Sequence, residues 1–132
     1  MKKAIVLIIL SFITPFSSAT ELEGVWELVS GEYVDNNGKL IDYKSIELNS
    51  LKIISTTHFS FTSVKRGKFW ASGSGTYQLS SGQYKEMLKY NSFGEKPGAE
   101  FIFTTKIEGE YWFNSRWNGD QRVEYEVWRR IE

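Results

Sequence analysis

The sequence predicts a single all-β domain, an antiparallel eight-stranded up-and-down β-barrel that follows an N-terminal signal peptide. From residue 24 onward, short runs rich in β-branched and aromatic residues alternate with turn residues at intervals of about ten. No stretch keeps the 3.6-residue apolar period of an amphipathic helix. The turns between most runs are short, so consecutive strands are expected to be neighbours in a meander.

Residues 1–19 have the pattern of a cleavable signal peptide. Two lysines precede an apolar run that ends at Pro15, and Ser17 and Ala19 are the small residues that precede a cut. The run is shorter than the roughly 20 residues of a spanning helix, and no cysteine follows the cut to carry a lipid anchor. We therefore expect cleavage after Ala19, no membrane anchor, and an exported domain of residues 20–132, either periplasmic or secreted.

The expected strands follow one another with little between them. In order, they cover Val25–Val34, Leu51–Thr56, His58–Val64, Phe69–Leu79, Gln83–Asn91, Glu100–Ile107, Tyr111–Trp117 and Arg122–Ile131. Glycines at 82, 109 and 119 supply the positive φ of tight hairpins. The longer joins, 35–49 and 92–98, are expected to be rim loops of a barrel mouth. The first strand can close on the last, and an open sandwich of the same strands is the alternative.

Composition excludes several classes of function. The chain has no cysteine and equal numbers of basic and acidic residues, and loss of the two signal-peptide lysines leaves a small acidic excess. Disulfides, thiol chemistry and thiolate metal sites are therefore excluded, and neither nucleic acid nor an anionic membrane is an expected partner. Phosphate-binding Gly-Lys motifs and a Gly-x-Ser-x-Gly elbow are also missing, so we expect no cofactor, no metal and no catalytic residue. We also expect the exported domain to be a monomer.

Two ends of the domain carry a resemblance to a known family. Gly24-Val25-Trp26 begins the first expected strand, and Val127-Trp128-Arg129-Arg130 ends the last. Together with Lys52-Ile53-Ile54, Thr57-His58-Phe59, Gly75-Thr76-Tyr77-Gln78-Leu79 and Tyr84-Lys85-Glu86, these segments resemble the small exported lipocalin-like (calycin) proteins of bacteria. The resemblance implies a calycin barrel whose base is closed by the tryptophan, with an arginine packed over it. The join between the first two strands is too short for the two-helix lid of fatty-acid-binding proteins.

The strand Gln83–Asn91 predicts a polar interior. Alternation places Tyr84, Glu86, Leu88 and Tyr90 on one face and two lysines on the other, which is the better solvent face. A buried carboxylate requires a partner, and Arg116 or Arg130 is the expected countercharge. A rim carboxylate or a structural ion pair is the alternative for Glu86.

Other polar and aromatic residues have plain structural alternatives. His58, the one histidine, is a candidate wall residue, and haem ligation or proton transfer are less favoured roles. The 5 Trp, 7 Tyr and 9 Phe suit either a ligand pocket or an ordinary sheet core. The arginines at 122, 129 and 130 beside Glu124 and Glu126 are expected to form a cross-strand charge ladder.

We therefore predict an exported lipocalin-like barrel that binds a small, apolar or amphipathic molecule in its interior. The candidate wall residues are Trp26, His58, Tyr77, Tyr84, Glu86, Arg116, Trp128 and Arg130. An exported interaction or inhibitor module acting through the rim loop 92–98 is the first alternative. A small barrel isomerase or cyclase, with Glu86 as base and Tyr84 or His58 as proton donor, is a second.

Overall fold

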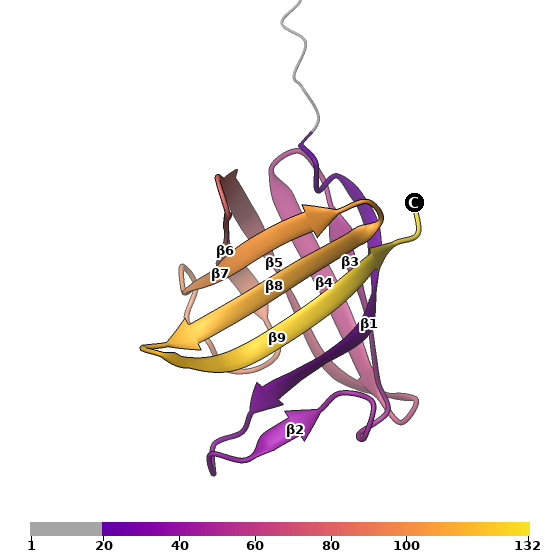
Figure 1. The fold of residues 1–132 in the computed structure, drawn as a ribbon, viewed down its shortest axis with the longest axis vertical. Coiled ribbons are helices and arrows are strands. Elements are labelled where there is room, and N and C mark those ends of the chain that lie inside the picture. Colours follow the sequence, from indigo (N-terminus) through magenta and orange to yellow (C-terminus); the bar gives the residue numbers. More distant parts are fainter. Residues whose placement is uncertain (1–19) are drawn as a thin grey trace, which may run out of the picture.

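A computed structural model describes residues 20–132, which form one closed antiparallel β-barrel (Figure 1). The strands are β1 (Gly24–Val34), β2 (Leu40–Asp42), β3 (Leu48–Ile54), β4 (His58–Lys65), β5 (Lys68–Ser80), β6 (Gln83–Asn91), β7 (Glu100–Glu108), β8 (Tyr111–Asn118) and β9 (Gln121–Arg130). The predicted signal peptide lies outside the described residues. No helix in the described part of the chain has the length and apolar character needed to cross a membrane.

The eight long strands follow chain order around the barrel, which closes where β1 pairs with β9. This closing ladder runs from Trp26 opposite Arg130 to Tyr33 opposite Glu124. It confirms the predicted eight-stranded meander and rules out the open sandwich. A β-bulge between Leu28 and Ser30 interrupts this ladder, and the residues of β1 before the bulge, Gly24 to Glu27, also pair with β3.

The short strand β2 is the one element of the described chain that the sequence did not predict. It lies within the predicted loop 35–49 and pairs with the end of β1, from Glu32 opposite Asp42 to Val34 opposite Leu40. Three residues are too few to show a period-2 pattern, so this strand had no signal in the sequence. β3 also begins earlier than expected, at Leu48, because its first residues pair with the end of β4.

The hydrophobic core fills one end of the barrel, which we call the base. Trp26 and Trp112 meet edge to face with their ring centroids 5.3 Å apart, and Tyr84 meets Trp112 in the same way at 4.9 Å. The segment before β1 seals this end, because Leu22 is fully buried and its carbonyl accepts a hydrogen bond from Trp26 Nε1 at 2.8 Å. This segment lies at the opposite end of the barrel from β2 (Figure 1).

The family resemblance predicted an arginine over the tryptophan at the base, and the structure contains this contact. The guanidinium carbon of Arg130 lies 4.2 Å from the ring centroid of Trp26. Its two terminal nitrogens donate to the backbone carbonyls of Glu23 and Glu21, each at 2.5 Å. The stacking and the two hydrogen bonds together tie the first described residues to the last strand.

Candidate functional site

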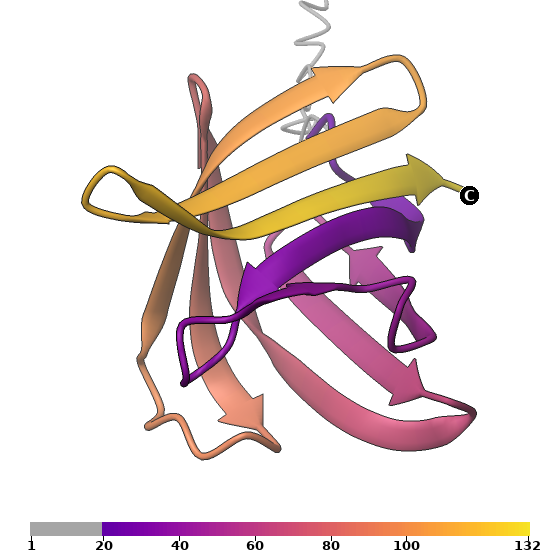
Figure 2. The ribbon, with the colours of Figure 1, turned by 60° about the horizontal axis from the view of Figure 1, so that its bottom comes forward.

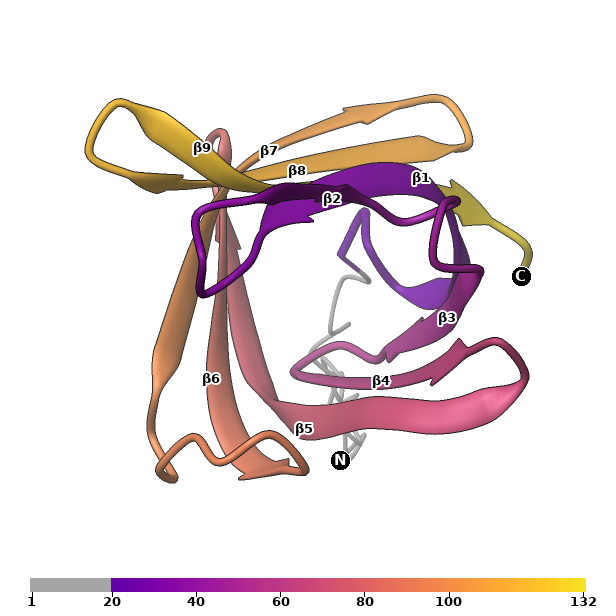
Figure 3. The same ribbon diagram turned by 90° about the horizontal axis from the view of Figure 1, so that it is seen from below.

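The other end of the barrel is open and leads into a cavity of about 500 Å³. Figures 2 and 3 show this end, which we call the mouth, with β2 and the loop between β6 and β7 at its edge. Aromatic and charged side chains dominate the wall. They are Tyr33, Tyr43, Phe61, Trp70, Phe93, Phe101, Phe103 and Trp128, together with Lys52, Glu86, Glu95, Arg116, Glu124 and Glu126.

The predicted rim loops both reach the mouth, because Asn36 and the pair Phe93 and Glu95 contribute to the cavity wall. Asn91 holds the loop that follows β6: its side-chain oxygen accepts hydrogen bonds from the amides of Phe93 and Glu95, each at 3.0 Å. Its side-chain nitrogen donates to the carbonyl of Glu95 at 2.8 Å. This one side chain therefore fixes the loop that carries Phe93 to the mouth.

Two groups of aromatic side chains line the mouth. Tyr33 stacks on Tyr43 at 5.7 Å between ring centroids and lies 6.2 Å from Trp70. Phe93 lies 6.1 Å from Phe61 and 6.5 Å from Phe101. Trp70 is 42% exposed and Phe93 is 43% exposed, so both rings are partly accessible to solvent.

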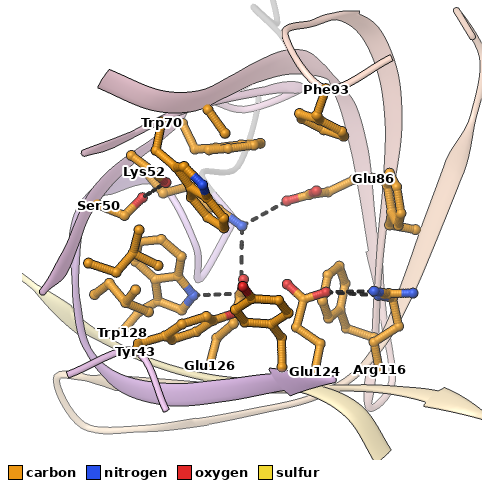
Figure 4. Close-up of a pocket in the computed structure, with 18 of the residues that line it drawn as sticks. Tyr43, Ser50, Lys52, Trp70, Glu86, Phe93, Arg116, Glu124, Glu126 and Trp128 are labelled. Atoms are coloured by element: carbon orange, nitrogen blue, oxygen red, sulfur yellow. Dashed lines mark hydrogen bonds and ion pairs between the residues drawn. The ribbon is translucent and has the colours of Figure 1, made fainter. Parts of the chain in front are cut away.

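Lys52 lies at the inner end of the cavity with only 3% of its surface exposed. Its Nζ lies 2.8 Å from Glu86 Oε1 and 3.9 Å from Glu126 Oε2 (Figure 4). It also lies over the rings of Trp128 and Trp112, at 4.9 Å and 5.2 Å from their centroids. Burial alone would lower the lysine pKa, but the charges of the two glutamates more than offset it and raise the pKa, so the ammonium is retained.

Glu86 faces the interior, as the alternation in β6 predicted, and is 4% exposed. Its Oε1 accepts hydrogen bonds from Lys52 at 2.8 Å and from Tyr84 Oη at 2.9 Å. The countercharge is therefore Lys52 and not Arg116 or Arg130. Burial and the neighbouring carboxylate raise the pKa of Tyr84 well above its ordinary value, so its hydroxyl stays a donor to Glu86.

Glu124 and Glu126 point into the cavity from β9, two residues apart and therefore on the same face of the strand. Arg116 stands opposite Glu124 on β8, and its Nε and one terminal nitrogen both lie 2.9 Å from Glu124 Oε2. Trp128 Nε1 donates to Glu126 Oε2 at 2.8 Å. Two like charges side by side in a partly dry site cannot both ionise freely, so the two carboxyls favour holding one proton between them.

The shared proton belongs mainly to Glu124. Burial, the charge of Glu126 and the contact with its carboxylate raise the pKa of Glu124 to about 8, against the opposing effect of Arg116. A fifth of the Glu124 side chain is exposed to the cavity, so water moderates this shift but does not reverse its direction. Burial also acts to raise the pKa of Glu126, but the charge of Lys52 and the hydrogen bond from Trp128 outweigh it and lower the pKa.

A buried amide stands next to this carboxyl pair. Asn114 is 1% exposed and lies opposite Glu126 in the pairing of β8 with β9. Its side-chain oxygen accepts a hydrogen bond from Thr105 Oγ1 at 2.7 Å, whereas its Nδ2 has no hydrogen-bond partner among residues 20–132.

Three of the eight predicted wall residues line the cavity, namely Glu86, Arg116 and Trp128. Trp26, Tyr77 and Tyr84 lie in the packed base. The hydroxyl of Tyr77 donates to the carbonyl of Ser55 at 2.7 Å, which fixes it away from the cavity. Arg130 covers Trp26 at the base.

His58 is exposed on the outside of the barrel, contrary to the expectation of an interior position. The inward face of β4 carries Phe59 and Phe61, so the alternation turns His58 outward. Its Nδ1 lies 2.7 Å from Thr57 Oγ1. Across residues 20–132, no three His, Cys, Asp or Glu side chains gather as metal ligands.

Tyr90 is also placed differently from the prediction, at 67% exposed. A β-bulge in the pairing of β5 with β6 sets Leu88 opposite Gly75 but Tyr90 opposite Ser74. The extra residue reverses the alternation, so Tyr90 leaves the face that Glu86 and Leu88 share.

The expected charge ladder on the last strand divides into two sets. Arg122 pairs with Glu32 at 3.3 Å and Arg129 pairs with Glu27, both across the ladder between β1 and β9 on the outer surface. Glu124 and Glu126 instead face the cavity. Trp128 was the signal in the sequence that could have placed these two glutamates inside. A tryptophan near the end of a strand is expected to face the core, and Glu126 and Glu124, two and four positions before it, share its face.

Comparison of the chain with protein-family models, with curated proteins and with solved structures gives no match. The assignment of this site therefore depends on its geometry and chemistry.

Proposed function

We propose that this chain is an exported, lipocalin-like carrier that binds one small, partly apolar molecule in the barrel cavity. The observation that carries the proposal is the cavity itself, about 500 Å³ and open at one end. This volume is within the range of small-molecule sites, which run from about 300 to 1,000 Å³. An eight-stranded barrel can be filled by its own side chains, and here only the base is filled.

The composition of the wall also supports ligand binding. Apolar rings surround the mouth, and a few polar groups converge at the inner end, which is the usual division between affinity and orientation in a ligand site. Burying Lys52, Glu86 and Glu126 costs free energy that a packed apolar core would avoid. A binding role gives a reason for retaining charges at this position.

The export part of the proposal rests on the pattern of residues 1–19. The lipocalin-like part rests on the closed barrel and on Arg130 packed over Trp26 at its base. Expression of the full chain in a bacterial host, followed by fractionation and intact mass measurement, tests export. A mature protein that begins at Thr20 in the periplasm or medium is the expected result, and an uncleaved cytoplasmic protein would overturn it.

The binding part is tested with a neutral apolar fluorophore, N-phenyl-1-naphthylamine, and two matched tryptophan variants. Ala71 lines the cavity, so A71W adds a large side chain to its interior, whereas Ser60 is exposed on β4, so S60W adds the same side chain outside. We expect the wild type and S60W to bind the fluorophore and A71W to lose it. Equal binding by all three proteins would place the fluorophore on the outer surface and contradict the proposal. Native mass spectrometry of the protein from its own host would identify a retained ligand.

A further inference from the structure

We propose that the cavity is selective for a small amphipathic molecule with one positive charge, whose ammonium or similar group binds between Glu124 and Glu126. This inference rests on the proposed function, and it adds the chemical class of the ligand. The apolar part of the molecule would lie between the two aromatic groups of the mouth, against Tyr43 and Trp70 on one part of the wall and Phe93 on the other.

The first argument is the balance of charge on the wall. Three carboxyl groups, on Glu86, Glu124 and Glu126, face two cationic groups, on Lys52 and Arg116. Glu95 adds a fourth carboxylate at the mouth. With all three carboxyls ionised the inner end lacks one positive charge, which the free protein supplies as the proton on Glu124 and which a cationic ligand can supply in its place.

The second argument is that both protein cations are already engaged. Lys52 is in contact with Glu86 and lies over aromatic rings, and only 3% of its surface is exposed. Arg116 directs two nitrogens at a single oxygen of Glu124. An anionic ligand would have to break one of these pairs, whereas a cationic ligand can bind without displacing any protein group.

The third argument is accessibility. The Glu124 side chain is 20% exposed, compared with 11% for Glu126 and 6% for Glu86. Arg116 occupies only Oε2 of Glu124, and the other oxygen points toward Glu126 and the interior (Figure 4). The carboxyl that a ligand reaches most easily is therefore also the one whose second oxygen is engaged only through the proton shared with Glu126, which a ligand ammonium can replace.

The protonation state of the carboxyl pair agrees with this geometry. Glu124 faces Glu126 on its own strand, Arg116 on β8, Lys52 on β3 and Tyr43 in the loop before β3. In this surrounding its pKa is raised, so the free protein holds a proton at neutral pH. A bound ammonium would supply the missing positive charge and release that proton. Binding would then be linked to deprotonation, with affinity rising as the pH rises toward 8.

The test compares three ligands of nearly equal shape and different charge: tryptamine is cationic, tryptophol is neutral and indole-3-acetate is anionic at pH 7. Isothermal titration calorimetry with the wild type should show tryptamine binding at least about 10-fold more tightly than tryptophol, since a charge-assisted hydrogen bond contributes about 1.5–3 kcal/mol. Indole-3-acetate should bind most weakly. Repeating the tryptamine titration in buffers of different ionisation enthalpy should show release of nearly one proton at pH 7.

Two Glu-to-Gln variants locate the effect. E124Q removes the accessible carboxyl and should reduce the preference for tryptamine over tryptophol to less than about 3-fold, with the proton release abolished. E32Q makes the same Glu-to-Gln replacement outside the cavity, in the outer pair with Arg122, and should keep the wild-type preference. The wild-type comparison of the three ligands stands without any variant.

The outcomes separate the two proposals. Tryptophol binding as tightly as tryptamine, or tighter binding of indole-3-acetate, would overturn the cation inference while leaving cavity binding intact. An equal loss of tryptamine preference in E32Q and E124Q would also overturn it, because the preference would then not depend on the carboxyl inside the cavity. If neither the indoles nor N-phenyl-1-naphthylamine binds in a way that A71W abolishes, the proposed function fails as well.

Discussion

Lys52 Nζ and Glu86 Oε1 are 2.8 Å apart inside the barrel, although the residues are 34 positions apart in the chain. They come from β3 and β6, which are not neighbours in the sheet, so the pair spans the interior. Both residues are at least 96% buried. A buried pair of this kind adds little net stability over an apolar pair, but either member becomes very costly when the other is removed.

Replacing Lys52 with methionine should therefore destabilise the protein strongly. The change leaves Glu86 and Glu126 buried without a cation, and we expect a loss of about 3–5 kcal/mol in the free energy of unfolding. Urea unfolding followed by circular dichroism measures it. The double variant K52M/E86L should recover part of the loss, because it also removes one of the stranded charges.

The control for this prediction is K106M. Lys106 and Glu108 are also within contact, at 2.7 Å, but both side chains are more than half exposed. An exposed pair contributes about 0–1 kcal/mol, so K106M should change stability little. If K52M were no more destabilising than K106M, the buried pair would not have the role that its position indicates.

The carboxyl pair predicts a specific pH dependence of stability. The pKa of Glu124 is raised in the folded state, so between about pH 5 and pH 8 the folded protein binds a proton that the unfolded chain has lost. Stability from this group is therefore greatest at low pH and is lost as the pH rises through that window. E124Q should remove this trend, and the difference between wild type and E124Q measured by urea unfolding at several pH values isolates it.

Glu126 should show the opposite trend. Its pKa is lowered in the folded state, so it contributes stability that is present above its unfolded pKa and is lost as the pH falls through its folded value. E126Q should therefore be least different from wild type at acidic pH. If both variants shifted stability in the same direction across the pH range, the two carboxyls would not form a pair with unequal pKa values.

The sequence predicted the architecture well because its signals are local. The glycine-containing turns predicted the positions of the hairpins. In β6, the two lysines that alternate with Glu86 indicated that Glu86 faces the interior. Lys52 was missed because β3 has apolar residues on both faces. Leu51 and Ile53 are 47% and 56% exposed, while the lysine between them is buried, which reverses the usual hydrophobic pattern.

Other features depend on contacts between distant parts of the chain. The bulge opposite Gly75 turns Tyr90 outward, and nothing in the run of residues 83–91 marks it. The cavity itself arises because large rings gather at the base while the residues near the mouth leave space between them. Which residues meet across a barrel depends on register and shear, which the period of a single strand does not specify.

Gly75 should be more sensitive to substitution than Gly73, two residues earlier in β5. A Cβ at Gly75 would overlap the backbone carbonyl oxygen of Met87, which cannot move without breaking the β5–β6 ladder. At Gly73 the nearest atom is in the ring of Phe61, at 2.7 Å, and this ring borders the cavity and has room to turn. We expect G75A to cost at least about 2 kcal/mol and G73A clearly less. Thermal unfolding of both variants tests the order, and the reverse order would contradict it.

Arg130 should limit the conformational freedom of residues 20–26, at the base of the barrel. Its guanidinium stacks on Trp26 and donates to the carbonyls of Glu21 and Glu23 at once. A lysine keeps the charge but lacks the planar fork that reaches both carbonyls while lying flat on the indole. In R130K, hydrogen exchange at residues 20–26 should therefore be about 10-fold faster, while exchange in the core strands β5 and β6 stays unchanged.

The matched control is R129K, at the neighbouring position on the same strand. Arg129 faces outward and pairs with Glu27, so its replacement keeps the contact of Arg130 with Trp26 intact. Exchange at residues 20–26 should remain at the wild-type rate in R129K. Because the segment that Arg130 holds also covers the base through Leu22, faster exchange in R130K alone would show that the arginine closes this end of the barrel. Equal exchange in the two variants would assign that closure to the packing of Leu22 and Trp26.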